Sequence, residues 1–308
     1  MSLALLFPGQ GAQKVGLGKD FYHEARYRQT FEEASDLLGY DLYDVCQTEK
    51  INETQYTQVA LFTASLATLK LLSLPEVAVG CGLSLGEYTA VAASQALSFA
   101  EFLPVVQMRG QLMQAQAEKV PGTMVAVLGA DLATIAAACE KVQAETKGIV
   151  QPCNFNTTSQ VVIGGEKAAV ELAVAELKAQ GIKKLIPLTV SGAFHSPLFQ
   201  TVADTMAEKL QTLSFNAGRF PILSNASGQV TTPSTMAQQL AKQIAAPVQM
   251  VTMCQTLADL GVTHTLEVGC GQVVSGLVKK NQKAIQTLAV DDPKSLTLAQ
   301  EKLEEYYA

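Results

Sequence analysis

Hydrophobic positions along the chain fall into short runs that alternate with amphipathic segments. Apolar runs typical of buried strands occupy Leu3 to Phe7 and Val77 to Cys81. Segments near Ala25 to Leu38 and near Val59 to Leu72, and one that begins at Leu85, have the spacing and composition of helices. This alternation predicts βα units and a mainly parallel sheet.

The middle of the chain has a different order of elements. Strand, helix, strand, strand, helix and strand are predicted in turn for "TMVAVLG", "DLATIAAACEKV", "IVQPCNF", "SQVVIGG", "EKAAVELAVAELKAQG" and "KKLIPLTV". This β-α-β-β-α-β order is that of a ferredoxin-like unit. The parallel pattern resumes in "FPILSN", "HTLEVG" and "AIQTLAV". We therefore predict an α/β protein with a small inserted domain at residues 121–190 and a discontinuous large domain at residues 1–120 and 191–308.

Composition and charge narrow the class of protein. The 308 residues are 48% hydrophobic and 16% charged, which indicates a compact globular chain. The formal net charge is −6 and the sequence contains no run of basic residues. Because nucleic acids and anionic membranes are bound through concentrated positive charge, we expect neither as a partner.

The compartment and the redox state follow from two further features. The apolar run near the N-terminus is only five residues long, which predicts a strand and not a signal peptide. No segment approaches a membrane span, so we expect a soluble, cytoplasmic protein. The six cysteines are scattered and form no C-x-x-C pair. They are predicted to be buried, reduced thiols, with no disulfide and no metal.

The strongest chemical motif is the serine in "GCGLSLGEY". An apolar strand ends at Ser84, glycines flank it at Gly82 and Gly86, and a helix is predicted to follow. This is the context of a nucleophile elbow, in which the serine hydroxyl projects clear of the sheet. The amide of Leu85 would then face an oxyanion from the helix N-terminus. The alternative is a tight strand-to-helix turn that only happens to contain a serine.

A serine nucleophile needs a base, and the chain has three histidines. His23 lies in the charged segment "YHEARYR", which indicates a solvated helix face, and His264 lies at the edge of "GVTHTLEVG", where we predict a turn. His195 lies in "TVSGAFHSPL", a segment rich in Gly, Ser and Pro that directly follows the predicted small domain. Loops at domain junctions commonly present catalytic groups, so His195 is the favoured base.

Two polar residues bear on the reaction class. Gln10 lies in the glycine-rich "FPGQGAQ" at the carboxyl end of the first strand, where it either completes an oxyanion hole or belongs to an ordinary turn. Arg109 lies in "VVQMRGQLMQ" among apolar and amide neighbours. It either extends its charge to water or is fixed to bind a carboxylate through its bidentate fork.

Taken together, these segments resemble the malonyl-CoA:acyl carrier protein transacylases and the related acyltransferases of polyketide synthases. The matching segments run in the family's order from end to end: "FPGQGAQ", "TQVALFTAS", "GLSLGEYTA", "QMRGQLMQ", "NFNTTSQVVIGG", "GAFHSPL", "SNASG", "PVQM" and "EVGCGQVVSGL". The resemblance implies a large hydrolase-like α/β domain interrupted by a ferredoxin-like domain, with the active site in the cleft between them.

The resemblance also implies residue roles. Ser84 would carry the acyl group, His195 would be the base and then the acid, and Arg109 would bind the malonyl carboxylate. Gln10 and the Leu85 amide would form the oxyanion hole, and the histidine would be oriented by a backbone carbonyl, which maps to Gln249. Further motif positions that would line or brace the cleft are Gln58, Met113, Asn154, Asn156, Gln160 and Phe194.

The chain departs from the family's usual pattern at three positions. Leu83 replaces the histidine of the common GHSxGE motif, Cys270 replaces the proline of EVGPG, and Gln272 replaces a lysine that is often found there. The first departure weakens assignment to the commonest bacterial housekeeping type. None of the three touches the nucleophile, the base or the arginine.

The implied reaction is ping-pong transfer of malonyl from coenzyme A to Ser84 and then to the phosphopantetheine thiol of an acyl carrier protein, without a cofactor. An alternative is a hydrolase that removes acyl groups from carrier proteins, and a second is a non-catalytic carrier-binding scaffold. The sequence does not distinguish fatty acid from polyketide synthesis. An acidic carrier would need a local basic patch, for which Lys183 with Lys184 or Lys279 with Lys280 are candidates, and nothing requires more than a monomer.

Overall fold

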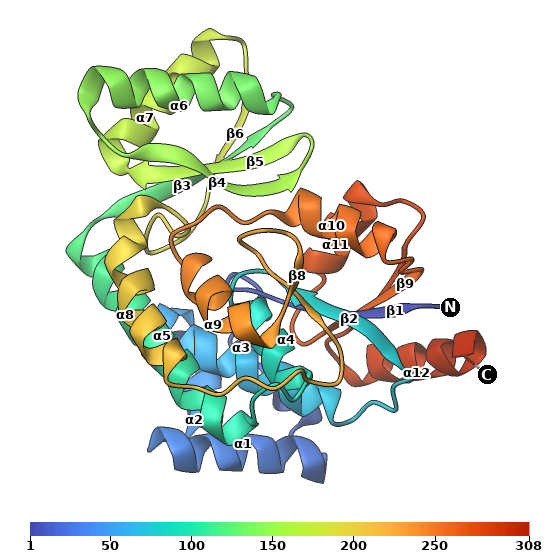
Figure 1. Ribbon diagram of the computed structural model, residues 1–308. Helices are drawn as coiled ribbons and strands as arrows, with labels where there is room; N and C mark the ends of the chain where they lie inside the picture. The colour runs from blue at the N-terminus through green and yellow to red at the C-terminus, as the bar shows by residue number, and fades with distance from the viewer. Residues whose placement is uncertain (308) are drawn as a thin grey trace.

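The computed structural model describes residues 1–307, which form two separate sheets (Figure 1). The strands of the larger sheet are β1 (Leu3–Phe7), β2 (Val77–Gly82), β7 (Ile222–Leu223), β8 (Val230–Thr231), β9 (His264–Val268) and β10 (Gln286–Val290), in the order β10-β9-β1-β2-β7-β8. The strands of the smaller sheet are β3 (Gly122–Leu128), β4 (Val150–Thr157), β5 (Gln160–Glu166) and β6 (Lys184–Pro187), in the order β4-β5-β3-β6.

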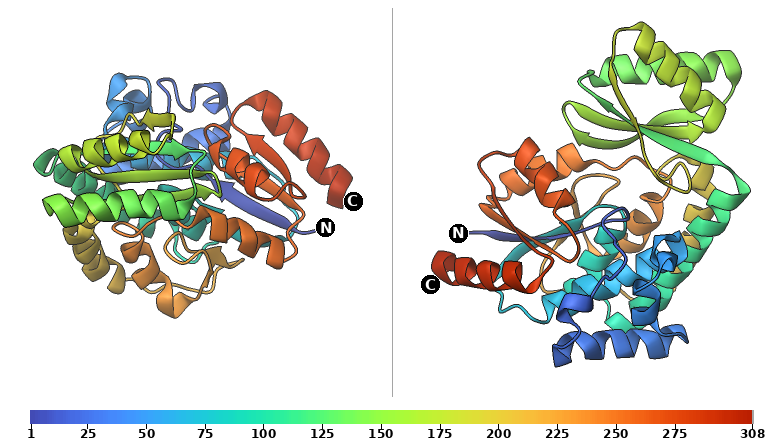
Figure 2. Two further views of the ribbon diagram at one scale, coloured as in Figure 1. Left: turned by 90° about the horizontal axis from the view of Figure 1, so that it is seen from above. Right: turned by 180° about the vertical axis from the view of Figure 1, so that it is seen from behind.

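Helices cover both sheets. They are α1 (Ala25–Leu38), α2 (Leu42–Cys46), α3 (Thr54–Leu69), α4 (Leu85–Ala93), α5 (Phe99–Lys119), α6 (Leu132–Thr146), α7 (Lys167–Ala179), α8 (Gln200–Gln211), α9 (Pro233–Lys242), α10 (Met250–Asp259), α11 (Val273–Asn281) and α12 (Pro293–Tyr307). Single 3-10 turns lie at Lys19–Phe21, Glu49–Asn52 and Pro197–Phe199. The views in Figure 2 place α6 and α7 on the face of the small sheet that points away from the large one.

The larger sheet is mainly parallel, and its central strand β1 is buried on both faces. Alternate residues of β1 enter opposite layers: Leu3 and Leu5 join the core made with α1 to α5, whereas Ala4 and Leu6 join a second core made with α10 and α11. This explains the unbroken apolar run, which is typical of a doubly covered parallel strand. β1 pairs in parallel with β2 and with β9, so the carboxyl ends of these strands meet at one edge.

The smaller sheet is antiparallel and has the predicted ferredoxin-like order. Its elements run from Gly122 to Pro187 and therefore lie inside the predicted range 121–190, although the domain boundaries themselves stay a prediction. Asp131 caps α6 by accepting a hydrogen bond from the Thr134 amide. Two backbone bonds tie β4 to the larger unit: Phe155 N donates to Val248 O at 2.9 Å, and Val248 N donates to Cys153 O at 2.9 Å.

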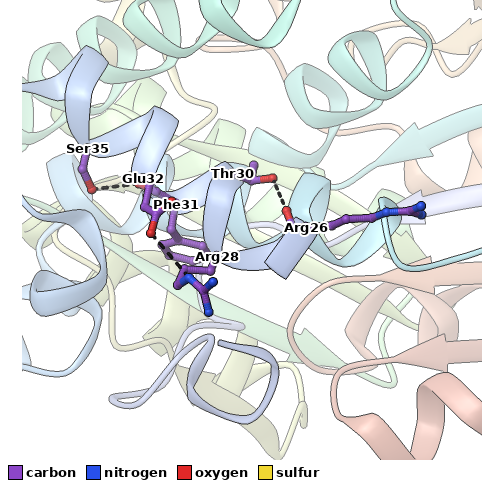
Figure 3. Close-up of polar contacts among 6 residues, drawn as sticks. All are labelled: Arg26, Arg28, Thr30, Phe31, Glu32 and Ser35. Carbon is purple, nitrogen blue, oxygen red and sulfur yellow. Dashed lines mark hydrogen bonds and ion pairs between the residues drawn. The ribbon is translucent and has the colours of Figure 1, made fainter. Parts of the chain in front are cut away.

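Helix α1 has the bounds that the hydrophobic pattern predicts. Its buried face includes Phe31, while Arg28 and Glu32 form an exposed ion pair at 3.5 Å with i,i+4 spacing (Figure 3). The Thr30 and Ser35 hydroxyls donate back to carbonyls one turn earlier. Because exposed ion pairs contribute little, burial of the apolar face is what holds this helix in place.

Two predictions from composition can be compared with the structure. No helix within residues 1–307 is long and apolar enough to cross a membrane. All six cysteines are buried and free. Burial was predicted for all of them and is confirmed.

Candidate active site

Ser84 occupies a sharp turn between β2 and α4. Its backbone angles, φ 54° and ψ −101°, lie in a region that residues other than glycine rarely adopt. A Cβ added at Gly82 would collide with the backbone of Gly86, and one added at Gly86 would collide with the carbonyl of Phe7. The glycines are therefore required by close backbone packing, and the predicted strand–turn–helix context of Ser84 is confirmed.

Hydrogen bonds hold the strained turn from two sides. The Ser84 amide donates to Asn225 Oδ1 at 2.8 Å, and the Ser84 carbonyl accepts from Gln243 Nε2 at 2.8 Å. Asn225 Nδ2 also donates to the Gly82 carbonyl at 2.7 Å. Such over-determination is what allows a strained backbone to persist. Leu85 is the first residue of α4, so its amide has no acceptor within the helix and is available to a ligand.

His195 is held as a neutral base. Its Nδ1 lies 2.7 Å from the Gln243 carbonyl, which can only accept a hydrogen bond, so the proton is assigned to Nδ1 and Nε2 keeps its lone pair. The side chain is buried, and its own φ is 61°. Burial, together with the nearby charge of Arg109, lowers the pKa of His195 to about 4.

The orienting carbonyl was predicted at Gln249, and that prediction is wrong. Gln249 is the N-cap of α10, and its carbonyl accepts from the Met253 amide at 2.9 Å as part of that helix. Gln243, the C-cap of α9, supplies the carbonyl instead. Gln243 and Gln249 lie at the two ends of the loop that connects α9 to α10. His195 contacts the end of this loop that follows α9.

The other two histidines lie elsewhere. His23 is exposed and pairs with Glu24 at 3.2 Å. His264 does not lie in a turn as predicted, because it begins β9 and packs against Tyr306 with ring centroids 4.4 Å apart. Neither lines the cavity that contains Ser84 and His195.

Arg109 is buried in α5 and points at the nucleophile. Its Nη2 donates to Ser84 Oγ at 3.0 Å and to Gln243 Oε1 at 3.2 Å, and its Nη1 donates to Gln58 Oε1 at 2.6 Å. The guanidinium also stacks 4.9 Å above the Tyr88 ring. Burial lowers the pKa of Arg109, but an arginine stays charged in proteins. Of the two readings of Arg109, the fixed guanidinium is therefore confirmed and extension to water is wrong.

One cavity of about 160 Å³ brings most of the predicted residues together. The predicted residues that line it are Gln10, Gln58, Ser84, Leu85, Arg109, Met113, Asn154, Asn156, Phe194 and His195. Its remaining walls are mostly apolar and come from Gly9, Leu83, Met124, Val162, Leu188 and Val190. Strands of the small sheet and the loops and helices of the large unit all contribute, so the cavity lies between the two units.

Gln160 is not part of this cavity. It begins β5 at the β4–β5 hairpin, where it pairs with Thr157 and Leu128. Gln10 does line the cavity, and its Nε2 donates to Thr54 Oγ1 at 3.0 Å. That contact uses one amide hydrogen and leaves the second for another acceptor.

Three residues next to the cavity were missed as site residues. Glu87 is fully buried, and its Oε2 accepts from the Asn225 amide at 2.8 Å and from Gln243 Nε2 at 3.2 Å. Burial raises the pKa of Glu87 to about 8. Glu87 and Asn225 belong to the quoted segments "GLSLGEYTA" and "SNASG", so a signal for them existed. Gln243 lies in "AKQIAAP", which carries no recognisable motif.

Comparison with known proteins agrees with this geometry. The profile of the acyl transferase domain family matches residues 4–299. The malonyl CoA-acyl carrier protein transacylase of Escherichia coli (strain K12) is 39% identical, and the match covers 97% of this chain and 98% of the relative. The enzyme of the same name from Staphylococcus aureus (strain MRSA252) is 34% identical, covering 93% and 94%.

The chain belongs to the malonyl CoA-acyl carrier protein transacylases. Solved structures of this family superpose on nearly the whole chain. A malonyl-transacylase in complex with its type II polyketide synthase acyl-carrier protein has a TM-score of 0.93 at 36% identity, covering 98% of this chain and 100% of that one. The Streptococcus pneumoniae enzyme has a TM-score of 0.92 at 38% identity, covering 98% and 100%. The predicted family and two-sheet α/β fold are both confirmed.

Proposed function

We propose that this chain transfers a malonyl group from malonyl-CoA to the phosphopantetheine thiol of an acyl carrier protein, through an ester on Ser84. The observation that carries this proposal is the environment of Arg109. Within residues 1–307, its hydrogen-bond and stacking partners are amides, a hydroxyl and an aromatic ring, with no carboxylate among them. A buried guanidinium beside the nucleophile is matched to an acyl group that brings its own carboxylate.

In the first half-reaction, His195 Nε2 accepts the proton of Ser84 while Oγ attacks the thioester carbonyl carbon of malonyl-CoA. A carbon–oxygen bond forms as the carbonyl electron pair moves onto oxygen. Collapse of this intermediate breaks the carbon–sulfur bond, and the protonated His195 gives its proton to the departing CoA sulfur. The Gln243 carbonyl holds the neutral imidazole in the required tautomer.

The oxyanion of each tetrahedral intermediate needs preorganised donors. The Leu85 amide at the start of α4 and the Gln10 side chain both line the cavity, and we assign them this role. The helix N-terminus adds a favourable dipole to the first of these donors.

The second half-reaction runs through the same groups. The carrier thiol gives its proton to His195, its sulfur attacks the malonyl ester carbon, and the bond from carbon to Ser84 Oγ breaks as the proton returns to that oxygen. Between the two steps the malonyl carboxylate would take the place of Ser84 Oγ as a partner of Arg109. The 3.0 Å distance between Nη2 and Oγ puts a carboxylate on a short serine ester within reach.

Selectivity against branched or uncharged acyl groups has two sources. Phe194 lines the cavity and would crowd a methyl branch on the malonyl carbon. Steric exclusion of one methyl is worth about 1 to 3 kcal/mol, so we expect this preference to be modest. Arg109 should discriminate more strongly, because an acetyl group brings no carboxylate to balance its buried charge.

For the carrier protein we propose docking beside β4. Lys279, Lys280 and Lys283 are exposed around a groove of about 530 Å³ whose other wall is Thr157 to Ser159. Asn156, the residue before Thr157, lines the catalytic cavity, and its carbonyl accepts from Asn281 Nδ2 at 2.8 Å. The groove therefore adjoins the cavity, which favours this lysine cluster over Lys183 and Lys184 for an acidic carrier.

Mass spectrometry of the intact chain after incubation with malonyl-CoA tests the proposal. We expect a malonyl adduct on Ser84 that is lost when a carrier protein bearing phosphopantetheine is added, with malonyl-carrier as product. The Ser84→Ala variant should remain unmodified. Free malonate as the main product would favour the hydrolase instead, and an unmodified wild-type chain would favour a scaffold.

Other features of this function stay predictions. These are the cytoplasmic location, the monomeric state, the absence of nucleic acid and membrane partners and the absence of a cofactor. Transfer rates to carriers of fatty acid and polyketide synthesis would identify the pathway.

A further inference from the structure

The Gln243 side chain makes contacts that are separate from the carbonyl that orients His195. Its Oε1 accepts from Arg109 Nη2 at 3.2 Å, and its Nε2 donates to the Ser84 carbonyl at 2.8 Å. The residue has no exposed surface. One amide therefore touches both the cation that would bind the substrate carboxylate and the backbone of the nucleophile turn.

Only one orientation of this amide satisfies its neighbours. Nε2 faces two acceptors, the Ser84 carbonyl and Glu87 Oε2 at 3.2 Å, while Oε1 faces a cationic donor. A flipped amide would place its NH₂ group against the guanidinium and its oxygen against two other oxygens. Glu87 Oε2 is itself fixed by the Asn225 amide, at 2.8 Å. The contact with Glu87 thus fixes the orientation of the Gln243 side-chain amide.

Arg109 depends on this arrangement for its aim. Its guanidinium is held at one end by Gln58 and at the other by Gln243, with the Tyr88 ring on its face. Without the Gln243 oxygen, Nη2 would keep Ser84 Oγ as its only partner, and that partner is lost when the serine becomes an ester. The contact to Gln243 would persist in the acyl-enzyme, when the carboxylate must be gripped.

We propose that the Gln243 side chain, fixed by Glu87, is a positioning residue for malonyl selectivity that aims the Arg109 guanidinium at the acyl group on Ser84. This inference rests on the proposed malonyl transfer. Gln243 would then have two separate functions. Its backbone carbonyl orients the base His195, and its side chain orients Arg109 for recognition of the acyl group.

The test compares malonyl-CoA with acetyl-CoA for the wild type and for Gln243→Leu, by steady-state acyl transfer and by melting temperature. The leucine variant keeps the backbone carbonyl but loses both side-chain contacts. We expect kcat/KM for malonyl-CoA to fall by about 10- to 100-fold, mainly through a higher KM, since a hydrogen bond to a charged group is lost. Acetyl-CoA should be affected much less, so the malonyl preference falls.

Two variants keep the test decisive. Gln239→Leu removes a glutamine of the same helix that hydrogen-bonds the Ser224 hydroxyl at 3.0 Å, outside the cavity, and it should leave the malonyl preference unchanged. Gln243→Glu would put a carboxylate against Arg109. It should therefore raise the KM for malonyl-CoA more than that for acetyl-CoA, and it decides the matter if the leucine variant fails to fold.

The outcomes separate the two proposals. Equal losses for both acyl donors, or an unchanged preference in Gln243→Leu and Gln243→Glu, would overturn the positioning role while the wild type still transfers malonyl. A wild type that forms no malonyl adduct would instead overturn the function on which this inference rests.

Discussion

Two regions of this molecule are suited to anions, and they differ in almost every physical respect. Arg109 is buried in a cavity of about 160 Å³, fixed by neutral groups and aimed at one hydroxyl. Lys279, Lys280 and Lys283 are exposed around a wider groove of about 530 Å³. A buried fixed charge discriminates between ligands, whereas flexible exposed charges mainly speed the encounter and are screened by salt.

The largest effect is expected from Arg109→Ala. Truncation of one partner of a buried charge pair costs about 2 to 5 kcal/mol, so kcat/KM for malonyl-CoA should fall by roughly 30-fold to several thousand-fold. Acyl chains without a carboxylate should be transferred better than by the wild type. Paired assays with malonyl-CoA and acetyl-CoA measure both changes. Full malonyl transfer by this variant would remove the main support for the proposed function.

The exposed lysines should behave in the opposite way. Replacement of Lys279, Lys280 and Lys283 by alanine should lower the rate of transfer to the carrier by about tenfold at low salt, with little change near 1 M salt. Formation of the malonyl adduct from malonyl-CoA should change less. The matched control is the double variant Lys183→Ala, Lys184→Ala. If the transfer rate fell more in that control, the carrier would instead dock beside β6.

The pH dependence of catalysis tests the buried site that contains Arg109 and His195. Because burial lowers the pKa of His195 to about 4, the imidazole stays neutral and able to accept a proton at any pH well above that value. We expect kcat/KM for malonyl-CoA to change less than about twofold between pH 7 and pH 5 and to fall only as the pH approaches 4. A pH profile with its acid limb near the ordinary histidine value of 6.5 would contradict this geometry.

The last prediction concerns the effect of Glu87 on the stability of the fold. Its pKa rises from 4.5 to about 8 on folding, so between these values the unfolded state releases a proton that the folded state keeps. The free energy of unfolding of the wild type should therefore fall as pH rises through this window, relative to Glu87→Gln, which does not titrate. Denaturant titrations of both proteins at several pH values measure the difference. Parallel curves would show that Glu87 is ionised throughout.

The sequence predicts the parts of the site whose chemistry is local. The elbow at Ser84 follows from glycine spacing, and His195 follows from elimination of two other histidines. Helix α1 follows from the hydrophobic pattern, and the β-α-β-β-α-β unit follows from its apolar runs together with the capping residue Asp131, the polar turn residues and Gly181.

The parts that depend on long-range packing were missed or misplaced. Gln243 matters because the end of α9 lies against both Ser84 and His195, and no motif records that approach. The family resemblance maps the orienting carbonyl to Gln249, six positions away, because Gln249 lies in the recognisable segment "PVQM". Gln160 lies on the β4–β5 hairpin, other residues of which line the cavity, but Gln160 itself does not line it. The contacts of Gln243 with Ser84 and His195 join elements that are far apart in the chain.

Burial of all six sulfhydryl groups has a practical consequence. Burial raises the pKa of Cys46, Cys139 and Cys254 to about 12, and those of Cys81, Cys153 and Cys270 also rise. Since the thiolate is the reactive form, alkylating reagents should leave the native protein unlabelled near neutral pH. A single cysteine engineered on the surface would then be a unique attachment point for a fluorophore or for a cross-linker carried on the pantetheine arm.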